Sequence, residues 1–180
     1  MIARLRATTV GAMVAATVAG CAADTVHMPA ADRSVCRAAG LPAPFDQIDP
    51  CAGQQVLAVA VRAVFTYQPL HQRDLAEALR SARPLLDDRF AAQAMSTTQV
   101  WGPITPARWQ QWRENRTEVH THVRLTADDH PPDTPTRLAR VLGVELDVPT
   151  DGVIGFPVYA IVIRAGDGQG WRLAGLRVPQ

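Results

Sequence analysis

The apolar positions of this chain follow a helical period in its first half. Residues 54–67, QQVLAVAVRAVFTY, space apolar side chains as a helix does, and although the valines also permit a strand, the length of the run favours a helix. A second helix is expected over residues 73–82, where Leu75 and Leu79 stand one turn apart. Pro84 is expected to start a third, short helix. The side chains that these helices should place in the core include Phe65, Leu85, Leu86, Phe90 and Ala91.

From residue 117 onward the period becomes two. In residues 117–125, TEVHTHVRL, apolar or small positions alternate with charged and histidine positions, as in a strand with one face in water. A less regular alternation continues over residues 136–148, and residues 156–165 and 171–178 flank the turn GDGQG as a hairpin. Helices followed by strands predict an α+β fold, with the helices on one face of a curved antiparallel sheet of about four strands.

The first twenty residues have the three parts of an export signal. Arg4 and Arg6 give a positive start, residues 7–20 carry no charge, and small residues end the run. The stretch is too short and too weakly apolar for a spanning helix, which needs about 20 strongly apolar residues. Its ending, VAGC with Cys21 last, resembles a bacterial lipobox, in which the cysteine is acylated and the preceding segment is removed. The alternative is an ordinary secretory signal cleaved near Ala23.

Acylation of Cys21 would leave Cys36 and Cys51 as an even pair in an oxidising compartment, which predicts a disulfide. Closing a loop of about 15 residues contributes roughly 3 kcal/mol in the chain-entropy account. A metal pair or a redox couple is disfavoured, because the spacing is not Cys-x-x-Cys and no histidine lies between the two. The expected parts are a signal peptide (1–20), a tether with a stapled loop (21–52) and an α+β domain (53–180).

The charge balance excludes whole classes of partner and chemistry. A net charge of +1, without a clustered basic excess, argues against nucleic acid as a partner. All 18 basic residues are arginine, which excludes a Schiff-base lysine and a phosphate-loop lysine. No motif indicates a cofactor.

Three of the four tryptophans lie in residues 101–112, WGPITPARWQQW. Trp109 and Trp112 are three residues apart and share a face if a short helix follows Pro106. Packing in the core is the simpler interpretation. The alternative is an exposed aromatic patch that binds a partner protein or the membrane interface.

Catalysis of the isomerase type needs a carboxylate base in an apolar cavity and an acidic donor such as a tyrosine. Tyr67 and Tyr159, the two tyrosines, are candidates to line such a pocket. Glu145 and Asp147 fall on the face of their strand that is expected to be in water. The sequence therefore offers no clear base, and we assign no catalytic residue.

The most metal-like feature is the pair His120 and His122, which point the same way on a strand. His130, Asp128 and Asp129, in the following turn, are candidates for further ligands. Two histidines are too few for a site, and a solvated strand face explains them more simply. We assign no metal ligand.

The proline-split ALRSARPLLDDRFAAQ, the long strands and the closing GWRLAGLRV resemble the nuclear-transport-factor-2-like (cystatin-like) cone fold, over about residues 53–178. Within that fold the chain is similar to envelope proteins of actinobacteria, namely Mce-associated proteins and extracytoplasmic domains of type IV secretion subunits. The resemblance implies a scaffold or assembly role, although some members are enzymes with a polar residue at the bottom of a conical pocket.

We therefore expect a non-enzymatic lipoprotein, anchored through its acyl chains to the outer surface of the cytoplasmic membrane, with other envelope proteins as partners. The alternative is a pocket protein that binds a small molecule or lipid, with isomerase-like activity.

Overall fold

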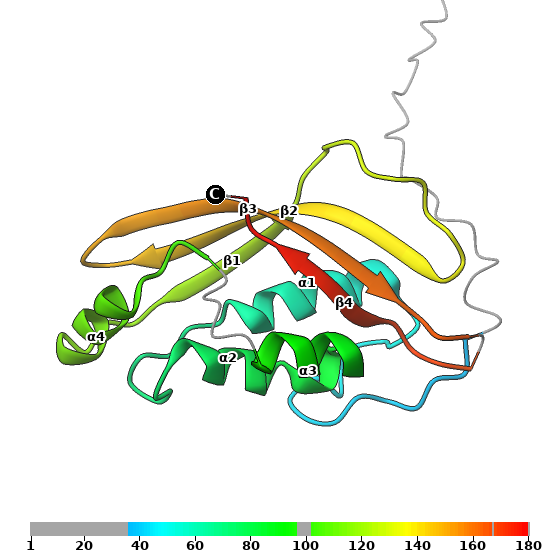
Figure 1. Ribbon diagram of the computed structural model, residues 1–180, viewed down its shortest axis with the longest axis horizontal. Helices are drawn as coiled ribbons and strands as arrows, with labels where there is room; N and C mark the ends of the chain where they lie inside the picture. The colour runs from blue at the N-terminus through cyan, green and yellow to red at the C-terminus, as the bar shows by residue number, and fades with distance from the viewer. Residues whose placement is uncertain (1–35, 97–101, 167, 180) are drawn as a thin grey trace, which may run out of the picture.

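Helices and strands form two layers in the computed structural model, which describes residues 36–96, 102–166 and 168–179 (Figure 1). The predicted α+β class is confirmed. The helices are α1 (Gly53–Val64), α2 (Leu75–Ser81), the 3-10 helix η2 (Arg83–Leu85), α3 (Asp88–Ser96) and α4 (Pro106–Glu114). Among the described residues, no helix combines the length and the apolar character that crossing a bilayer requires.

The second layer is an antiparallel sheet in the order β1-β2-β3-β4. Its strands are β1 (His120–Leu125), β2 (Arg137–Val148), β3 (Gly152–Ile163) and β4 (Arg172–Arg177). The two central strands have 12 residues each and pair along their whole length, from Arg137 opposite Ile163 to Val148 opposite Gly152. The predicted strands are confirmed, with β3 starting before the predicted residue 156.

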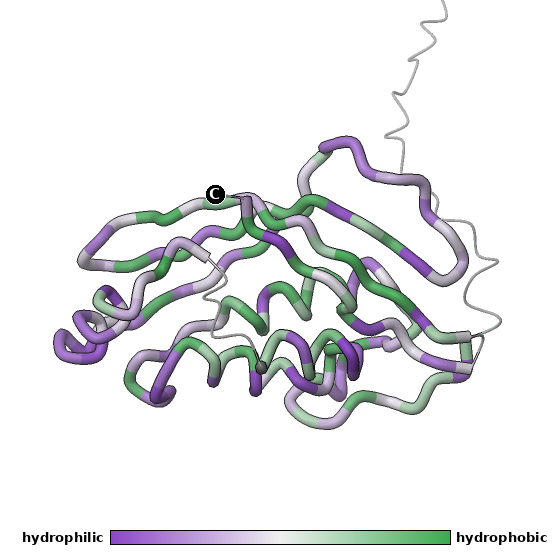
Figure 2. The backbone as a smooth tube through the Cα atoms, viewed as in Figure 1, coloured by the Kyte–Doolittle hydropathy of each residue, from purple (hydrophilic) through white to green (hydrophobic). Residues whose placement is uncertain are grey.

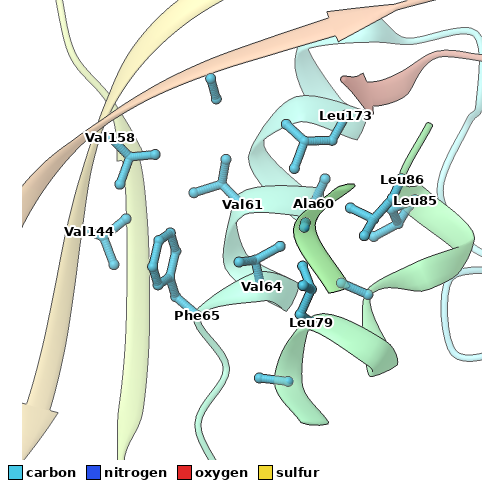
Figure 3. Packing of buried hydrophobic residues seen from close by; sticks show 14 of the residues in the cluster. Ala60, Val61, Val64, Phe65, Leu79, Leu85, Leu86, Val144, Val158 and Leu173 are labelled. Carbon is cyan, nitrogen blue, oxygen red and sulfur yellow. The ribbon is translucent and has the colours of Figure 1, made fainter. Parts of the chain in front are cut away.

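Helix α1 lies beneath the sheet and supplies the middle of the core (Figure 1). Its apolar residues recur every three or four positions, so one face of the helix is apolar and packs against the strands. The buried residues of that face include Val56, Leu57, Ala60, Val61 and Val64. Figure 3 shows Val61 and Phe65 directed toward Val144 of β2 and Val158 of β3. This contact fixes the distance between the two layers.

The short helix predicted to start at Pro84 is found as two separate helices. Pro84 lies in η2, and α3 begins only at Asp88. Between them Leu86 is extended and forms a parallel bridge with Leu173 of β4, where the Asp87 amide donates to the Leu173 carbonyl at 2.8 Å. Pairing with β4 therefore interrupts the helix. The predicted apolar stripe of Leu85, Leu86, Phe90 and Ala91 is nevertheless buried.

Alternation along β2 and β3 separates two faces of the sheet. Toward the helices, Leu142, Val144 and Leu146 of β2 and Val158 and Val162 of β3 are buried. The opposite side, which we term the outer face, carries no helix (Figure 1). The outward positions are Arg137, Ala139, Val141, Gly143, Glu145 and Asp147 on β2, and Val153, Gly155, Pro157, Tyr159, Ile161 and Ile163 on β3.

The predicted disulfide between Cys36 and Cys51 is present, with a sequence separation of 15. The loop that it closes packs on the domain, which corrects its assignment to a tether. Leu41 is buried, and the Trp171 amide donates to the Pro50 carbonyl at 2.8 Å. The stapled loop is therefore part of the folded unit.

Gly53, the first residue of α1, is a position of close approach. A β-carbon there would collide with Leu138 and would lie 3.0 Å from the buried Trp171 ring, whereas nothing lies within 4 Å of such an atom at exposed Gly40. We predict that Gly53→Leu lowers the free energy of unfolding by about 1–3 kcal/mol through overpacking. Gly40→Leu, the matched control, should change it by less than about 0.5 kcal/mol. Chemical denaturation measures both, and equal stability of the two variants would contradict the packing.

Candidate functional site

The predicted tryptophan pair sits on α4, a short helix at one end of the molecule (Figure 1). Thr105 caps the helix by accepting from the Arg108 amide at 3.2 Å, and Pro106 occupies the first turn. Trp109 and Trp112 are 2% and 0% exposed. The packing interpretation is confirmed, and the alternative of an exposed aromatic patch at these two residues is wrong.

Both indoles are buried because each N–H finds a partner on another segment. Trp112 Nε1 donates to Asp151 Oδ2 at 2.9 Å, in the turn between β2 and β3. Trp109 Nε1 donates to the Arg73 carbonyl at 3.3 Å, just before α2. The tryptophans therefore fasten α4 to the sheet and to the other helices.

Asp151 joins two of these attachments. The hydrogen bond from Trp112 holds the pKa of the Asp151 carboxyl below its usual range, with smaller contributions from a Thr150 hydrogen bond and from the Arg108 guanidinium. Arg108 Nη1 lies 3.4 Å from Asp151 Oδ2. The Asp151 carboxylate thus contacts both Arg108, in the first turn of α4, and Trp112, in its second turn.

The two tyrosines lie on opposite sides of the sheet and do not line one pocket. Tyr67 is buried, its ring stands edge-on to Trp109 at 6.0 Å between centroids, and burial raises its pKa above the usual range. Tyr159 is on the outer face, 42% exposed, with the Arg177 guanidinium 4.9 Å from its ring centroid. The predicted pairing of Tyr67 and Tyr159 is wrong, because residue 159 has the outward parity of β3.

No carboxylate lies beside Tyr67 among the buried groups that the structure describes. The buried polar and charged residues are Gln72, Thr117, Arg140 and Arg164. The Gln72 side chain accepts from the Gln68 amide at 2.8 Å and donates to the Thr66 carbonyl at 3.2 Å. It therefore stabilises the loop before α2. Tyr67 therefore works as part of the core in this arrangement.

The predicted solvated histidine face is confirmed. His120 and His122 are exposed, in register with Asp147 and Glu145 of β2. His130 lies instead near Arg140, with its Nδ1 3.3 Å from Nη1 of that residue. In the described ranges, no group of three histidine, cysteine, aspartate or glutamate side chains is placed to hold a metal ion.

A buried arginine is a feature that the sequence reading missed. Arg140 has the inward parity of β2 and is 8% exposed. Its guanidinium donates to both oxygens of Asp133, at 2.6 and 2.7 Å, and to the Ala139 carbonyl at 2.7 Å. The loop between β1 and β2 is therefore closed by a bidentate ion pair. The sequence signal that could have revealed this ion pair is an arginine at position 140, where the alternation of the strand expects an apolar residue.

The outer face is the best candidate for an interaction surface. All six outward positions of β3 are uncharged, although a strand facing water normally carries polar side chains there. Val153 is 66% exposed and Tyr159 is 42% exposed on this face. A contiguous exposed apolar patch marks a place where another molecule binds. Here Val153 and Tyr159 stand six positions apart on β3, and Arg177 lies over the Tyr159 ring.

Cys21, the predicted lipidation site, lies outside the residues that the structure describes. The segment that begins at residue 36, coloured blue, starts at the end of the molecule opposite α4 (Figure 1). The two ends differ in character, and Figure 2 shows hydrophilic residues gathered along α4.

No family model matches this chain, and no curated protein or solved structure matches it either.

The Arg140–Asp133 pair generates a pH prediction. Hydrogen bonding to Arg140 lowers the pKa of Asp133, so its contribution to stability is present above the unfolded pKa of about 3.9 and is lost as the pH falls through the folded pKa. We predict that Asp133→Asn lowers the free energy of unfolding by about 1–2 kcal/mol at pH 7, because Arg140 keeps a buried charge without its counter-ion. The deficit should shrink below about pH 4.

Urea unfolding at several pH values measures this deficit. The exposed Asp129→Asn, in the same loop, serves as control and should match the native protein. A deficit independent of pH would contradict the assignment to the carboxylate.

Proposed function

We propose that this protein is a lipid-anchored cell-envelope protein that works without catalysis, as a scaffold or assembly subunit of an envelope transport or secretion system. The observation that carries the proposal is the Cys36–Cys51 disulfide. A structural disulfide fits an exported, oxidising setting. It also leaves Cys21, the last residue of the lipobox-like VAGC, as the one cysteine of three without a disulfide role.

The proposed anchor would fix how the domain faces its surroundings. Fifteen residues separate Cys21 from Cys36, and at full extension such a segment reaches at most about 50 Å. The disulfide end would then stay within that distance of the membrane, while α4, at the other end, would point away from it (Figure 1). Burying two or three acyl chains, at about 0.8 kcal/mol per methylene, makes such an anchor stable.

We further propose the cone-shaped, nuclear-transport-factor-2-like arrangement as the finer description of the fold. Three features support it: helices under one face of the sheet, long central strands, and a closing hairpin. Large side chains, among them Trp112, Trp171, Phe65 and Leu57, are fully buried in the core. A core that buries such large side chains favours the scaffold role over a pocket for a small molecule or lipid.

Changing Cys21 tests the anchor. We predict that Cys21→Ala leaves the precursor unprocessed or releases the protein from membranes, because the acylated thiol is lost. Membrane fractionation with intact-mass measurement checks this. An unchanged distribution and an unchanged difference between precursor and mature mass would contradict the proposal.

The other two cysteines provide the matched control. Cys36→Ser with Cys51→Ser should leave the protein in the membrane fraction and lower its free energy of unfolding by roughly 3 kcal/mol, since a loop of 15 residues is no longer closed in the unfolded chain. Mass spectrometry of the native protein without reductant should find Cys36 joined to Cys51. Two freely alkylated thiols there would reject the exported, oxidised state.

A further inference from the structure

Strand β1 is an open edge of the sheet. At the opposite edge, Leu86 covers part of β4 by forming a bridge with Leu173. No such segment covers β1, because within the described part of the chain its backbone forms hydrogen bonds only with β2. An open edge of this kind is a template for pairing with another strand.

The backbone groups that β2 leaves unpaired belong to every second residue of β1. The Thr126 amide donates to the Val141 carbonyl at 3.1 Å, so the amides of the even-numbered residues point toward β2. The amides and carbonyls of Thr121 and Val123, and of Val119 just before the strand, therefore point to the open side.

Strand β1 lacks the features that usually protect an edge. It contains no proline, and its register with β2 runs without a shift. Its side chains on the helix side are Thr121, Val123 and Leu125, and Leu125 is 44% exposed. Its one arginine, Arg124, is on the outer face. Another strand can therefore pair with β1 without burying a charge.

We propose that β1 of a second copy of this chain pairs with β1, antiparallel, across a two-fold axis at Thr121. The two sheets then form one continuous sheet. Val119 of each copy pairs with Val123 of the other, and both valines are half-buried against the core. Such an interface is isologous, so every contact away from the axis forms twice.

Charge complementarity selects this register. With the axis at Thr121, Glu118 of each copy stands opposite Arg124 of the other. Moving the axis one residue later sets Arg124 against His120 instead. Moving it one residue earlier sets Glu118 against His122 and leaves Arg124 beyond the end of the other strand. Among these registers, the axis at Thr121 gives both charged residues an opposite charge.

The remaining charges beside the axis do not oppose this pairing. Arg124 leans over Gly143 toward Glu145, which is 3.5 Å away, but its side chain is 68% exposed. A guanidinium has five N–H donors, so it can also donate to Glu118 of the other copy. The two histidines of β1 each lie opposite a carboxylate of β2. The positive charges of β1 therefore keep acidic neighbours in the dimer.

Disulfide trapping in the full-length protein tests the register. His120→Cys and His122→Cys are placed on two differently tagged chains made in the same cells. In the proposed dimer these positions are directly opposite, with β-carbons about 4.5–5.5 Å apart, which is close to disulfide spacing. A reductant-sensitive species that carries both tags and has twice the chain mass is expected.

The controls for trapping use the same chain. Either variant alone should link less, because the same residue of two copies lies diagonally, about 7–8 Å apart. Val153→Cys, exposed on β3 away from the edge, is the matched control, and the native chain gives the background from its own three cysteines.

Charge reversal provides an independent test. Glu118→Arg or Arg124→Glu alone should weaken the dimer roughly 10-fold, because two attractions become two repulsions. The double variant should restore it. Within one chain the two residues lie about 20 Å apart along an extended backbone, so only contact between copies explains such a rescue. Light scattering of the detergent-extracted protein measures the dimer, and circular dichroism checks that each variant is folded.

Three results would overturn the inference. They are trapping no greater than for Val153→Cys, a dimer indifferent to charge reversal, or a linked species of another mass, which would mean that a different protein pairs with β1. Membrane fractionation is independent of all three, so loss of the dimer and loss of the anchor are told apart.

Discussion

The packing of α1 on the sheet is the contact on which the rest of the structure depends. This single helix touches all four strands and α2, so the sheet and α2 are positioned relative to it. Burying a valine, leucine or phenylalanine side chain contributes about 1.5–3 kcal/mol, and α1 with Phe65 supplies several of them. The absence of a side chain at Gly53 lets the start of the helix approach Leu138 and Trp171. Sheet, helices and stapled loop are held around this one line of apolar residues.

Local periodicity predicted the helices and strands well. It failed where a contact with a distant segment determines the local backbone conformation. Alternation over residues 136–148 is a property of the strand itself, so β2 was predictable. The extended step at Leu86 exists only because Leu173 lies beside it, about 90 residues away along the chain. In the same way, the contact of Pro50 with Trp171 draws the supposed tether into the domain. Neither contact can be predicted from the spacing of apolar residues within a short segment.

The same limit applies to the candidate site residues. The spacing of Trp109 and Trp112 places them on one face of a helix, but it does not predict what covers that face. Their hydrogen bonds to Arg73 and Asp151 show that it packs against the sheet and the other helices. Alternation along β3 puts Tyr159 on the outer face, away from the buried Tyr67. Which of the two alternating sets of β3 faces the helices could be known only from the structure. Arg140 could have been noticed as a charge on an apolar face, whereas its partner Asp133 lies in a loop whose course the sequence does not specify.

The disulfide also decides how mechanical tension would travel through the molecule. A pull on the chain before Cys36 passes across the sulfur bridge to Cys51 and directly into the start of α1 two residues later. The residues between the two cysteines are bypassed by such a pull. If the proposed anchor at Cys21 holds, tension on it would reach α1 without passing through the loop that the disulfide closes.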